Sequence, residues 1–525
     1  MIWAANLSLV FFGLLAYFNA IHHPFVHDDV VFILQNPHIK DLSHWYQAFY
    51  MQGASDGINT YYRPVLEVLY RLEYFLFGSN PAGFHFFNVL VHIINGLLIF
   101  RLLKKLAIAE HVAWIVSLIF LIHPVQTEAV SCIAGISNLW VALCVLLALN
   151  AYIDQWYAVS FLFFLLGMLS KEQGIMLIPM VMVLDIARGQ KQWQAWVYWI
   201  LSALVFLWLR HQVTGASLSH DMNVSHGELY LRLEAIPRVL GMDLRLIFWP
   251  CDLHYYRSTD ILQSNTLAWI LGFLTTMGII FIYQKWSQVR FILILGLGWF
   301  IAALLPVLNI VPLINEYSFI LTAEHFLYLP MVGVLLMVVY ALYALVSVER
   351  IREIVLGVII TACLMLTWYQ NTFWRSEIAV FERMLQFEPN FGRGHLLLAK
   401  AYYFDGRYSQ ADGHFQKAFD IMTGYVRKAG NETARKFYRD YLKEIFFDWA
   451  QNDCALGQWQ RALGILQKDI EVFGDDAKVY NNMAFIDAHL GDKNKAIQYL
   501  KKALQADPAF EQARQNLAIL AKTAT

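Results

Sequence analysis

The N-terminal stretch IWAANLSLVFFGLLAYFNAIHHPFVHDDVVFILQNPHI (residues 2–39) joins a long apolar run to a polar segment with four histidines and two adjacent aspartates. The apolar part, Ile2 to Ala20, is long enough for a helix to cross the hydrocarbon core of a bilayer. It lacks a basic leading region and a small-residue cleavage site, so we expect a retained span and not a signal peptide. The pair Asp28 and Asp29 would follow directly on this span.

The composition extends this expectation to the whole chain. Of its 525 residues, 58% are hydrophobic and only 15% are charged, whereas soluble globular chains carry about 25% charged residues. The formal net charge of -1 provides no bulk attraction to nucleic acid or to anionic lipid, and we do not expect nucleic acid as a partner. The five cysteines are scattered and lack zinc-site spacing, so the pattern predicts neither a disulfide framework nor a metal site.

Apolar stretches of membrane-spanning length predict about eleven spans. Lysines and arginines in short loops prefer the cytoplasmic side, and every such cluster agrees with a cytoplasmic N-terminus: Arg101, Lys104, Lys105, Arg188, Lys191, Lys285, Arg290, Arg350 and Arg352. The outer face then receives the segments 21–83, 213–265 and 309–324 and everything after about residue 372. The predicted spans centre near residues 11, 94, 121, 146, 165, 181, 203, 275, 299, 336 and 363.

The segment ELYLRLEAIPRVLGMDLRLIFWP (Glu228 to Pro250) is apolar enough to suggest a further span. Five charged side chains would then lie at membrane depth, at a cost of a few kcal/mol each. We therefore predict an amphipathic helix that lies at the outer interface.

After Trp374 the charges return, and small residues recur at regular offsets. Ala462 and Ala496 are 34 residues apart, which is the tetratricopeptide period, whereas Ala411 precedes Ala462 by 51. We expect the longer connection around Gly424 to Tyr441. The chain therefore predicts an all-α protein: a polytopic membrane domain over residues 1–373, followed by a soluble α-solenoid of tetratricopeptide repeats over 374–525.

Ionisable residues gather in the segments assigned to the outer face, and such residues at a membrane boundary are functional candidates. For Arg63 and Lys171 the alternative of a snorkelling anchor stays open. His85 and His92 lie seven residues apart on one helical face, where hydrogen bonds between helices are favoured over metal binding. The candidate site residues are Asp28, Asp29, Arg63, His123, Glu128, Lys171, Glu172, Arg245, Glu324 and His325.

These residue types suit the transfer of a sugar from a polyprenyl phosphate. The chain shows no Gly-rich nucleotide loop, Walker pattern or D-x-D motif, and a lipid-linked sugar is an activated donor at the outer surface. An aspartate can take the proton of the acceptor hydroxyl, while cationic groups stabilise the departing phosphate. One direct displacement would invert the anomeric centre. A divalent metal is compatible with this chemistry, but no cofactor is required, because side chains can neutralise a monophosphate.

Eight blocks of the sequence occur in a collinear order: FVHDD, ILQNP, YYRPV, NPAGFHFFNVLVHIINGLL, HPVQTEAV, SKEQG, AEHFLYLP and NTFWRSEIAVFERMLQFEPN. In these blocks the chain resembles the transmembrane-and-tetratricopeptide-repeat protein O-mannosyltransferases, and the resemblance is to a bacterial relative located in the inner membrane. The resemblance implies a GT-C glycosyltransferase fold, a dolichyl- or undecaprenyl-phosphate sugar as donor, a protein Ser/Thr hydroxyl as acceptor held by periplasmic repeats, and a catalytic motif at Asp28 and Asp29. Two arginines usual in the family are replaced by Ile136 and His325.

Two other functions stay open at this point. An O-antigen-ligase-like enzyme would take its sugar from a lipid diphosphate, but that class carries its arginine and histidine chemistry on a late outer loop. A non-enzymatic membrane scaffold would use the repeats as a docking surface and would make the aspartates incidental.

Overall fold

The computed structural model describes residues 2–50, 61–190, 193–214, 226–257, 282–286, 289–308, 322–429 and 432–522, with residues 270, 272, 277 and 310 between these ranges. Regular structure in these ranges consists of helices, without a strand, which confirms the all-α prediction. The chain divides into two compact units, Met1–Ser376 and Glu377–Thr525.

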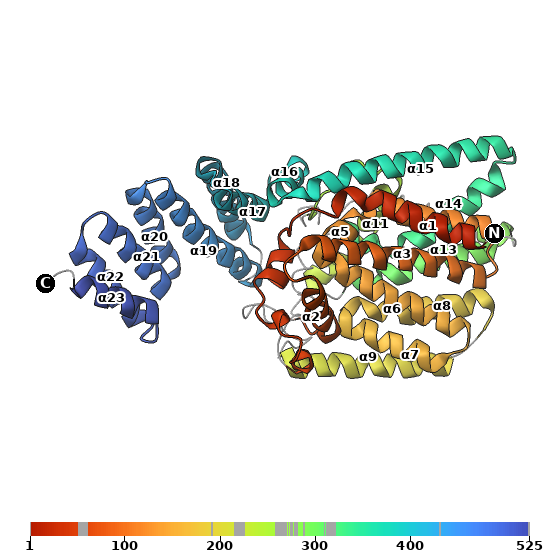
Figure 1. The fold of residues 1–525 in the computed structure, drawn as a ribbon, viewed down its shortest axis with the longest axis horizontal. Coiled ribbons are helices and arrows are strands. Elements are labelled where there is room, and N and C mark those ends of the chain that lie inside the picture. Colours follow the sequence, from red (N-terminus) through yellow and green to blue (C-terminus); the bar gives the residue numbers. More distant parts are fainter. Residues whose placement is uncertain are drawn as a thin grey trace. The chain divides into compact units, whose positions relative to one another are not determined.

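Ten of the eleven apolar stretches predicted as spans form helices in the first unit, and Figure 1 shows α1, α3 and α6 side by side. The stretch near residue 275 lies almost wholly outside the described residues. The ten helices are α1 (Ile2–Tyr17), α3 (Pro81–Lys105), α4 (Glu110–Ile122), α6 (Ile136–Ile153), α7 (Tyr157–Ser170), α8 (Leu177–Arg188), α9 (Trp193–Thr214), α13 (Arg290–Leu304), α14 (Met331–Leu345) and α15 (Glu349–Asn371).

Five helical segments of the described chain are long and apolar enough to cross a membrane, and the count of eleven spans stays a prediction. A sixth candidate is α4 together with the segment Pro124–Ser131, which turns by 51°. The turn falls at His123, whose extended backbone is the conformation that a following proline favours. The five segments are Trp3–Ala20, Pro81–Lys105, Ile133–Ile153, Arg290–Val307 and Glu349–Arg375.

Buried polar side chains join these helices to one another. His92 uses one ring nitrogen on the Tyr328 hydroxyl at 2.7 Å and the other on the Leu121 carbonyl at 3.0 Å. His85 contacts the His23 carbonyl at 3.1 Å. Both histidines therefore serve as hydrogen-bonding groups between segments, as the sequence predicts.

Asn371, the first residue of the block NTFWRSEIAVFERMLQFEPN, also joins helices through buried hydrogen bonds. The Asn371 side chain donates to the Ala16 carbonyl at 3.0 Å and to Asn19 at 2.8 Å. It accepts from the Ser131 hydroxyl at 2.8 Å. Because Asn371 is wholly buried, its polar groups depend on these partners, and they join the end of α15 to the end of α1.

The segments predicted for the outer face contain helices of their own. The first holds η2 (Val30–Leu34), η3 (His38–Lys40), η4 (Trp45–Phe49) and α2 (Pro64–Phe77). The predicted amphipathic helix is α11 (His226–Phe248), which contains Pro237. Its Asp243 is buried and accepts from the Thr322 hydroxyl at 2.6 Å, so part of its polar face points into the protein. Its position relative to a membrane stays a prediction.

The second unit is a series of helices that pair in chain order (Figure 1). Three pairs turn at Gly406, Gly457 and Gly491, each with a positive φ of 74–88° that favours glycine. The helices are α16 (Glu377–Phe387), α17 (Gly392–Phe404), α18 (Tyr408–Lys428), α19 (Glu432–Ala455), α20 (Trp459–Phe473), α21 (Ala477–His489), α22 (Lys493–Ala506) and α23 (Glu511–Lys522).

Alanines at the repeated offsets are buried where the paired helices approach. Ala411, Ala462 and Ala496 are each 0% exposed, because only a small side chain permits such close packing. The additional residues between the first and second repeats lengthen α18 and α19 to 21 and 24 residues. Most of the longer connection expected at 424–441 is therefore helical.

Candidate functional site

The two adjacent aspartates occupy different environments. The Asp28 side chain is 43% exposed, and its carboxylate contacts His27 Nε2 at 3.4 Å and the Tyr255 hydroxyl at 3.4 Å. Asp29 is 1% exposed. Asp28 can therefore meet a substrate, while Asp29 faces the protein interior.

Asp29 connects the segment after α1 to the segment before α6. Its Oδ2 accepts from the Val26 amide at 3.0 Å, and its Oδ1 accepts from the Ala134 amide at 2.7 Å. The Cys132 thiol lies 3.4 Å from the same Oδ1. Burial raises the pKa of Asp29 to about 7, although these backbone hydrogen bonds lower it. The Asp29 side chain therefore links the backbone just before Asp28 to the backbone at Ala134.

Arg63 and Glu172 form a buried ion pair between α2 and the turn after α7. Arg63 donates from Nε and Nη2 to Glu172 Oε2 at 3.0 and 2.9 Å. Its guanidinium also lies 4.1 Å from the centroid of the Tyr61 ring. Burial would raise the pKa of Glu172, but Arg63 and Arg210 together hold it below its ordinary value. Because its head group binds inside the protein, Arg63 is not a snorkelling anchor.

Lys171 is buried with neutral partners. Its ammonium donates to Asn138 Oδ1 at 2.5 Å and lies 3.4 Å from the Ser137 hydroxyl. Burial lowers its pKa to about 7, and the nearby charge of Arg63 acts in the same direction. With a side chain 3% exposed, Lys171 is also not a snorkelling anchor. At neutral pH its amine is only partly protonated, and an anion bound beside it would favour the protonated, charged form.

Two further carboxylates of the site have cationic or histidine partners. Glu128 Oε1 lies 2.8 Å from His325 Nδ1, and its Oε2 accepts from the His325 amide at 2.9 Å. Glu324 Oε1 accepts from Arg257 Nη1 at 3.1 Å and from the His254 amide at 2.6 Å. The short helix η12 (Glu324–Leu327) is thus bonded to two other parts of the chain. Its Glu324 contacts residues 254 and 257, and its His325 contacts Glu128.

The charged residues of the site influence the pKa values of one another. The charges of Arg63, Glu172, Glu128 and Asp28 all act on the pKa of Lys171. Arg257 and Glu128 act in turn on the pKa of Glu324, which burial raises. Ion pairs and these charge effects therefore connect seven residues into one electrostatic cluster, which consists of Asp28, Arg63, Glu128, Lys171, Glu172, Glu324 and His325.

His123 and Arg245 lie outside this set of interacting side chains. His123 Nε2 donates to the Ile247 carbonyl at 2.9 Å, and its Nδ1 accepts from the Val125 amide at 3.2 Å. Both ring nitrogens are thus occupied by the backbone. Arg245 forms a bidentate ion pair with Asp252, with donor–acceptor distances of 2.9 and 2.8 Å. This pair joins α11 to the segment that follows it, residues 249–257.

That segment contains two residues that the sequence did not single out. Arg257 is 1% exposed and pairs with Glu324. Tyr255 contacts Asp28, and its ring packs edge-on against His27 at 5.6 Å and Trp374 at 6.1 Å. Non-glycine residues with positive φ lie on both sides of this contact, at His27 (52°) and Tyr256 (65°). Such strained backbone is common at functional sites, but it is visible only in the structure, and no motif of the sequence marks Tyr255 or Arg257.

Metal ligands do not cluster in the described part of the chain, where no group of three His, Cys, Asp or Glu side chains is arranged to hold an ion.

The comparisons with known proteins confirm the resemblance to protein O-mannosyltransferases. "Protein O-mannosyl-transferase F38B6.6" of Caenorhabditis elegans is 24% identical over 80% of this chain and 63% of its own length. "Protein O-mannosyl-transferase TMTC4" of Mus musculus is 24% identical over 75% of this chain and 63% of its own. A shorter match, to "Protein O-mannosyl-transferase TMTC1" of Mus musculus, is 33% identical over 33% of this chain and 21% of that protein. The chain thus spans less than two thirds of the length of these relatives.

The tetratricopeptide repeat family model matches residues 477–510, which contain α21 and α22 and confirm the predicted repeat. Among solved structures, the crystal structure of MamA is 20% identical, with a TM-score of 0.24 over 28% of this chain and 76% of that one. The Cut9-Hcn1 structure is 11% identical, with a TM-score of 0.25 over 84% of this chain and 90% of that one. Scores this low bear on no functional question.

We predict that Asp29 makes the stability of the protein depend on pH. Its pKa in the folded chain is about 7, against about 3.9 when unfolded, so the folded state holds the proton more tightly. The resulting stabilisation is complete below pH 4 and is lost as the pH rises to 7, at about 1.4 kcal/mol per pH unit. In detergent, the temperature at which monodisperse protein is lost should fall between pH 5 and 7 and level off above 7.

Asp29→Asn should flatten this slope, and it should lower stability at pH 7 because an amide nitrogen cannot accept from a backbone N–H. Asp28→Asn is the matched control and should keep the slope, since its side chain is partly exposed. Equal slopes in the wild type and in Asp29→Asn would contradict the assignment.

Proposed function

We propose that this chain is a GT-C glycosyltransferase of the outer, periplasmic membrane face that transfers a sugar from a polyprenyl phosphate to a serine or threonine hydroxyl of a protein. One observation carries the proposal. Asp28 is the carboxylate of the cluster that solvent reaches, at 43% exposure of its side chain, whereas those of Glu128, Glu172 and Glu324 are 2–5% exposed and paired. The relatives named O-mannosyltransferases suggest mannose as the sugar.

In this reaction Asp28 is the general base. It accepts the proton of the acceptor hydroxyl as the hydroxyl oxygen forms a bond to the anomeric carbon. The bond from that carbon to the phosphate oxygen breaks on the opposite face, and polyprenyl phosphate leaves with the bonding electron pair. The anomeric centre is inverted in this single displacement. The Tyr255 hydroxyl, 3.4 Å from Asp28, orients the carboxylate.

The phosphate requires positive charge that is not already neutralised. Arg63 and Arg257 are each paired with a glutamate, while the hydrogen-bond partners of Lys171 are neutral. Lys171 is therefore the best candidate for the phosphate ligand. It is bound by Asn138 and Ser137, which follow the position where Ile136 replaces the usual arginine of the family. Lys171 supplies the charge that this replacement removes.

Replacement of Asp28, the proposed base, should strongly reduce transfer without unfolding the protein. We expect Asp28→Asn to reduce kcat by about 10²–10⁴-fold, the usual contribution of a general base. The assay measures transfer from labelled polyprenyl-phosphate sugars to periplasmic proteins in nanodiscs. Asp41→Asn is the control, because Asp41 is an exposed carboxylate of the same segment.

The same variant separates an enzyme from a scaffold. If Asp28→Asn restored every function of a deletion strain, the scaffold alternative would replace the enzyme. If wild-type protein used a lipid diphosphate sugar in preference to the monophosphate, the O-antigen-ligase-like alternative would replace it.

We also predict that donor binding weakens as the pH rises through 7. A phosphodiester-linked donor keeps one negative charge across this range, whereas Lys171, with a pKa of about 7, loses its proton as the pH rises. The KM for the donor should therefore rise about tenfold or more between pH 6 and 8.5, since a charge-assisted hydrogen bond contributes about 1.5–3 kcal/mol.

Lys171→Gln should have a high KM that no longer depends on pH. Lys40→Gln, in an exposed position of the first outer segment, should keep the wild-type profile. An unchanged profile in Lys171→Gln would assign the phosphate to another group.

The repeat unit offers a place for the acceptor protein. A cavity of about 410 Å³ lies among α17, α19, α20 and α21, and its lining includes Tyr403, Cys454, Trp459 and Phe485. Aromatic walls of this kind bind large apolar side chains of a peptide. The proposal is that the acceptor docks here and that the membrane unit glycosylates it.

We expect Phe485→Ala to raise the KM for the acceptor protein several-fold and to leave transfer to a short soluble peptide unchanged. Phe485 is 61% exposed, so its loss should not unfold α21. Phe404→Ala is the control: this aromatic is 78% exposed and does not line the cavity. Equal effects of the two variants on the acceptor KM would rule out the cavity.

A further inference from the structure

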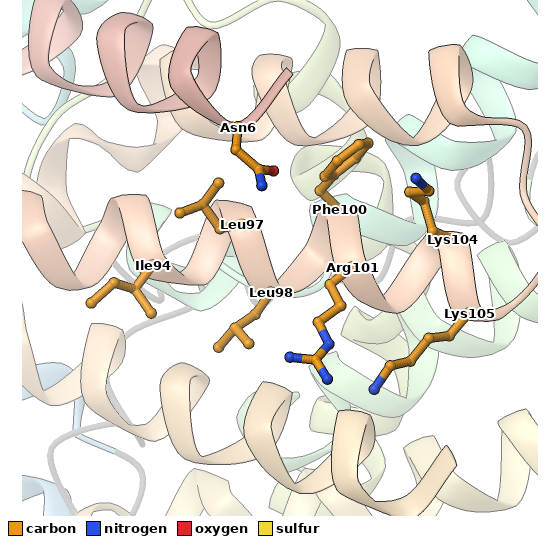
Figure 2. Close-up of a pocket in the computed structure, with 8 residues that line it drawn as sticks. All are labelled: Asn6, Ile94, Leu97, Leu98, Phe100, Arg101, Lys104 and Lys105. Carbon is orange, nitrogen blue, oxygen red and sulfur yellow. The ribbon is translucent and has the colours of Figure 1, made fainter. Parts of the chain in front are cut away.

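A second pocket, which we name the basic pocket, lies along α3 in the membrane unit. Its volume is about 560 Å³. One part of its lining is apolar, with Ile94, Leu97 and Leu98, and the other is cationic, with Arg101, Lys104 and Lys105. Figure 2 shows these side chains in sequence along α3, between neighbouring helices.

The position of the cationic part along α3 matches the thickness of a membrane. Arg101 is 20 residues beyond Pro81, where α3 begins, and so lies about 30 Å along the helix axis. That is about the thickness of the hydrocarbon core. His85, near the beginning of α3, contacts the His23 carbonyl of the segment that carries Asp28. The cationic part of the basic pocket is therefore at the opposite end of α3 from the candidate functional site, and a bilayer crossed by α3 would have its headgroups at this level.

The cations are only partly neutralised by the protein. Lys105 lies 2.6 Å from Asp154 Oδ2, and Lys104 lies 3.1 Å from Glu110 Oε2. Arg101 shares Asp154 at 3.7 Å, and its side chain is 62% exposed. Three cations thus face two carboxylates, and the guanidinium of Arg101 is available to an outside anion.

Asn6 of α1 adds a polar group among the apolar residues. Its side-chain amide makes no hydrogen bond to any described residue, and Figure 2 places it beside Leu97. Leu97 precedes Arg101 by one helical turn, or about 6 Å along the axis. The glycerol esters of a phospholipid lie at this depth below the phosphate. An ester carbonyl would accept from the Asn6 amide.

We propose that the basic pocket binds one anionic phospholipid. The phosphate contacts Arg101 and Lys104, a glycerol ester accepts from Asn6, and an acyl chain lies against Ile94, Leu97 and Leu98. A free anion would satisfy the cations alone, whereas a lipid uses the apolar part as well. Basic pockets between membrane helices are known to recognise anionic headgroups. Because the net charge of the chain is -1, the chain as a whole does not attract anionic lipid, and the attraction comes from the three cations of the basic pocket.

Native mass spectrometry of the full chain in detergent tests the proposal, with phosphatidylglycerol, phosphatidylcholine and inorganic phosphate as probes. Wild-type protein should bind one phosphatidylglycerol more tightly than phosphatidylcholine, and millimolar inorganic phosphate should not displace it. The double variant Arg101→Gln, Lys104→Gln should bind phosphatidylglycerol about tenfold or more weakly, since each basic residue near an anionic lipid contributes roughly fivefold. Arg350→Gln removes an exposed charge from the beginning of α15 and should change nothing.

A second variant keeps the test decisive if the double variant does not fold. Leu98→Trp fills the apolar part, leaves every charge in place, and should weaken phosphatidylglycerol binding while phosphate binding stays the same. Wild-type affinity for phosphatidylglycerol in either variant would overturn the proposal. Displacement of the lipid by inorganic phosphate would overturn it too, since the pocket would then recognise an anion and no acyl chain.

Discussion

The buried carboxylate of Asp29 is the constraint on which the candidate site depends. It accepts hydrogen bonds from the Val26 and Ala134 amides, which lie on segments separated by more than a hundred residues. The second segment is also bound from α3, where the Asn88 amide donates to the Cys132 carbonyl at 2.9 Å. The neighbouring Asp28 carboxylate contacts the Tyr255 hydroxyl and the His27 ring, each at 3.4 Å. In our proposal Asp29 is therefore a positioning residue, and Asp28 is the residue that reacts.

The charges of the site follow a simple rule. Each fully buried glutamate of the described cluster has a basic partner, as Glu172 has Arg63 and Glu324 has Arg257. Such pairing offsets part of the high cost of burying a charge, and removal of one partner would leave the other charge buried and uncompensated. What remains is one accessible carboxylate, Asp28, and one lysine with neutral partners, Lys171. In our proposal these two act on the acceptor and on the donor, and the paired residues hold them in place.

The sequence predicted much of this arrangement, because composition and period report directly on membrane helices and repeats. Charge counting placed the site residues on one face, and most of them do interact. Sequence could not separate Asp28 from Asp29, because neighbouring side chains diverge and only the fold determines which is buried. It also could not single out Arg257 among the arginines of residues 232–257, because its role depends on Glu324, 67 residues away. The two backbone partners of His123, the Ile247 carbonyl and the Val125 amide, likewise cannot be read from a motif.

The lengthened helices α18 and α19 have a further consequence for how this protein can change over time. The spacing between Ala411 and Ala462 exceeds the 34-residue period by 17 residues, or nearly five helical turns, yet the buried alanines keep their places. A helical pair can evidently grow at the end away from its glycine turn while the contacts to its neighbours stay intact. Length variation among related chains should therefore concentrate in such free ends, where new surface arises without a new fold.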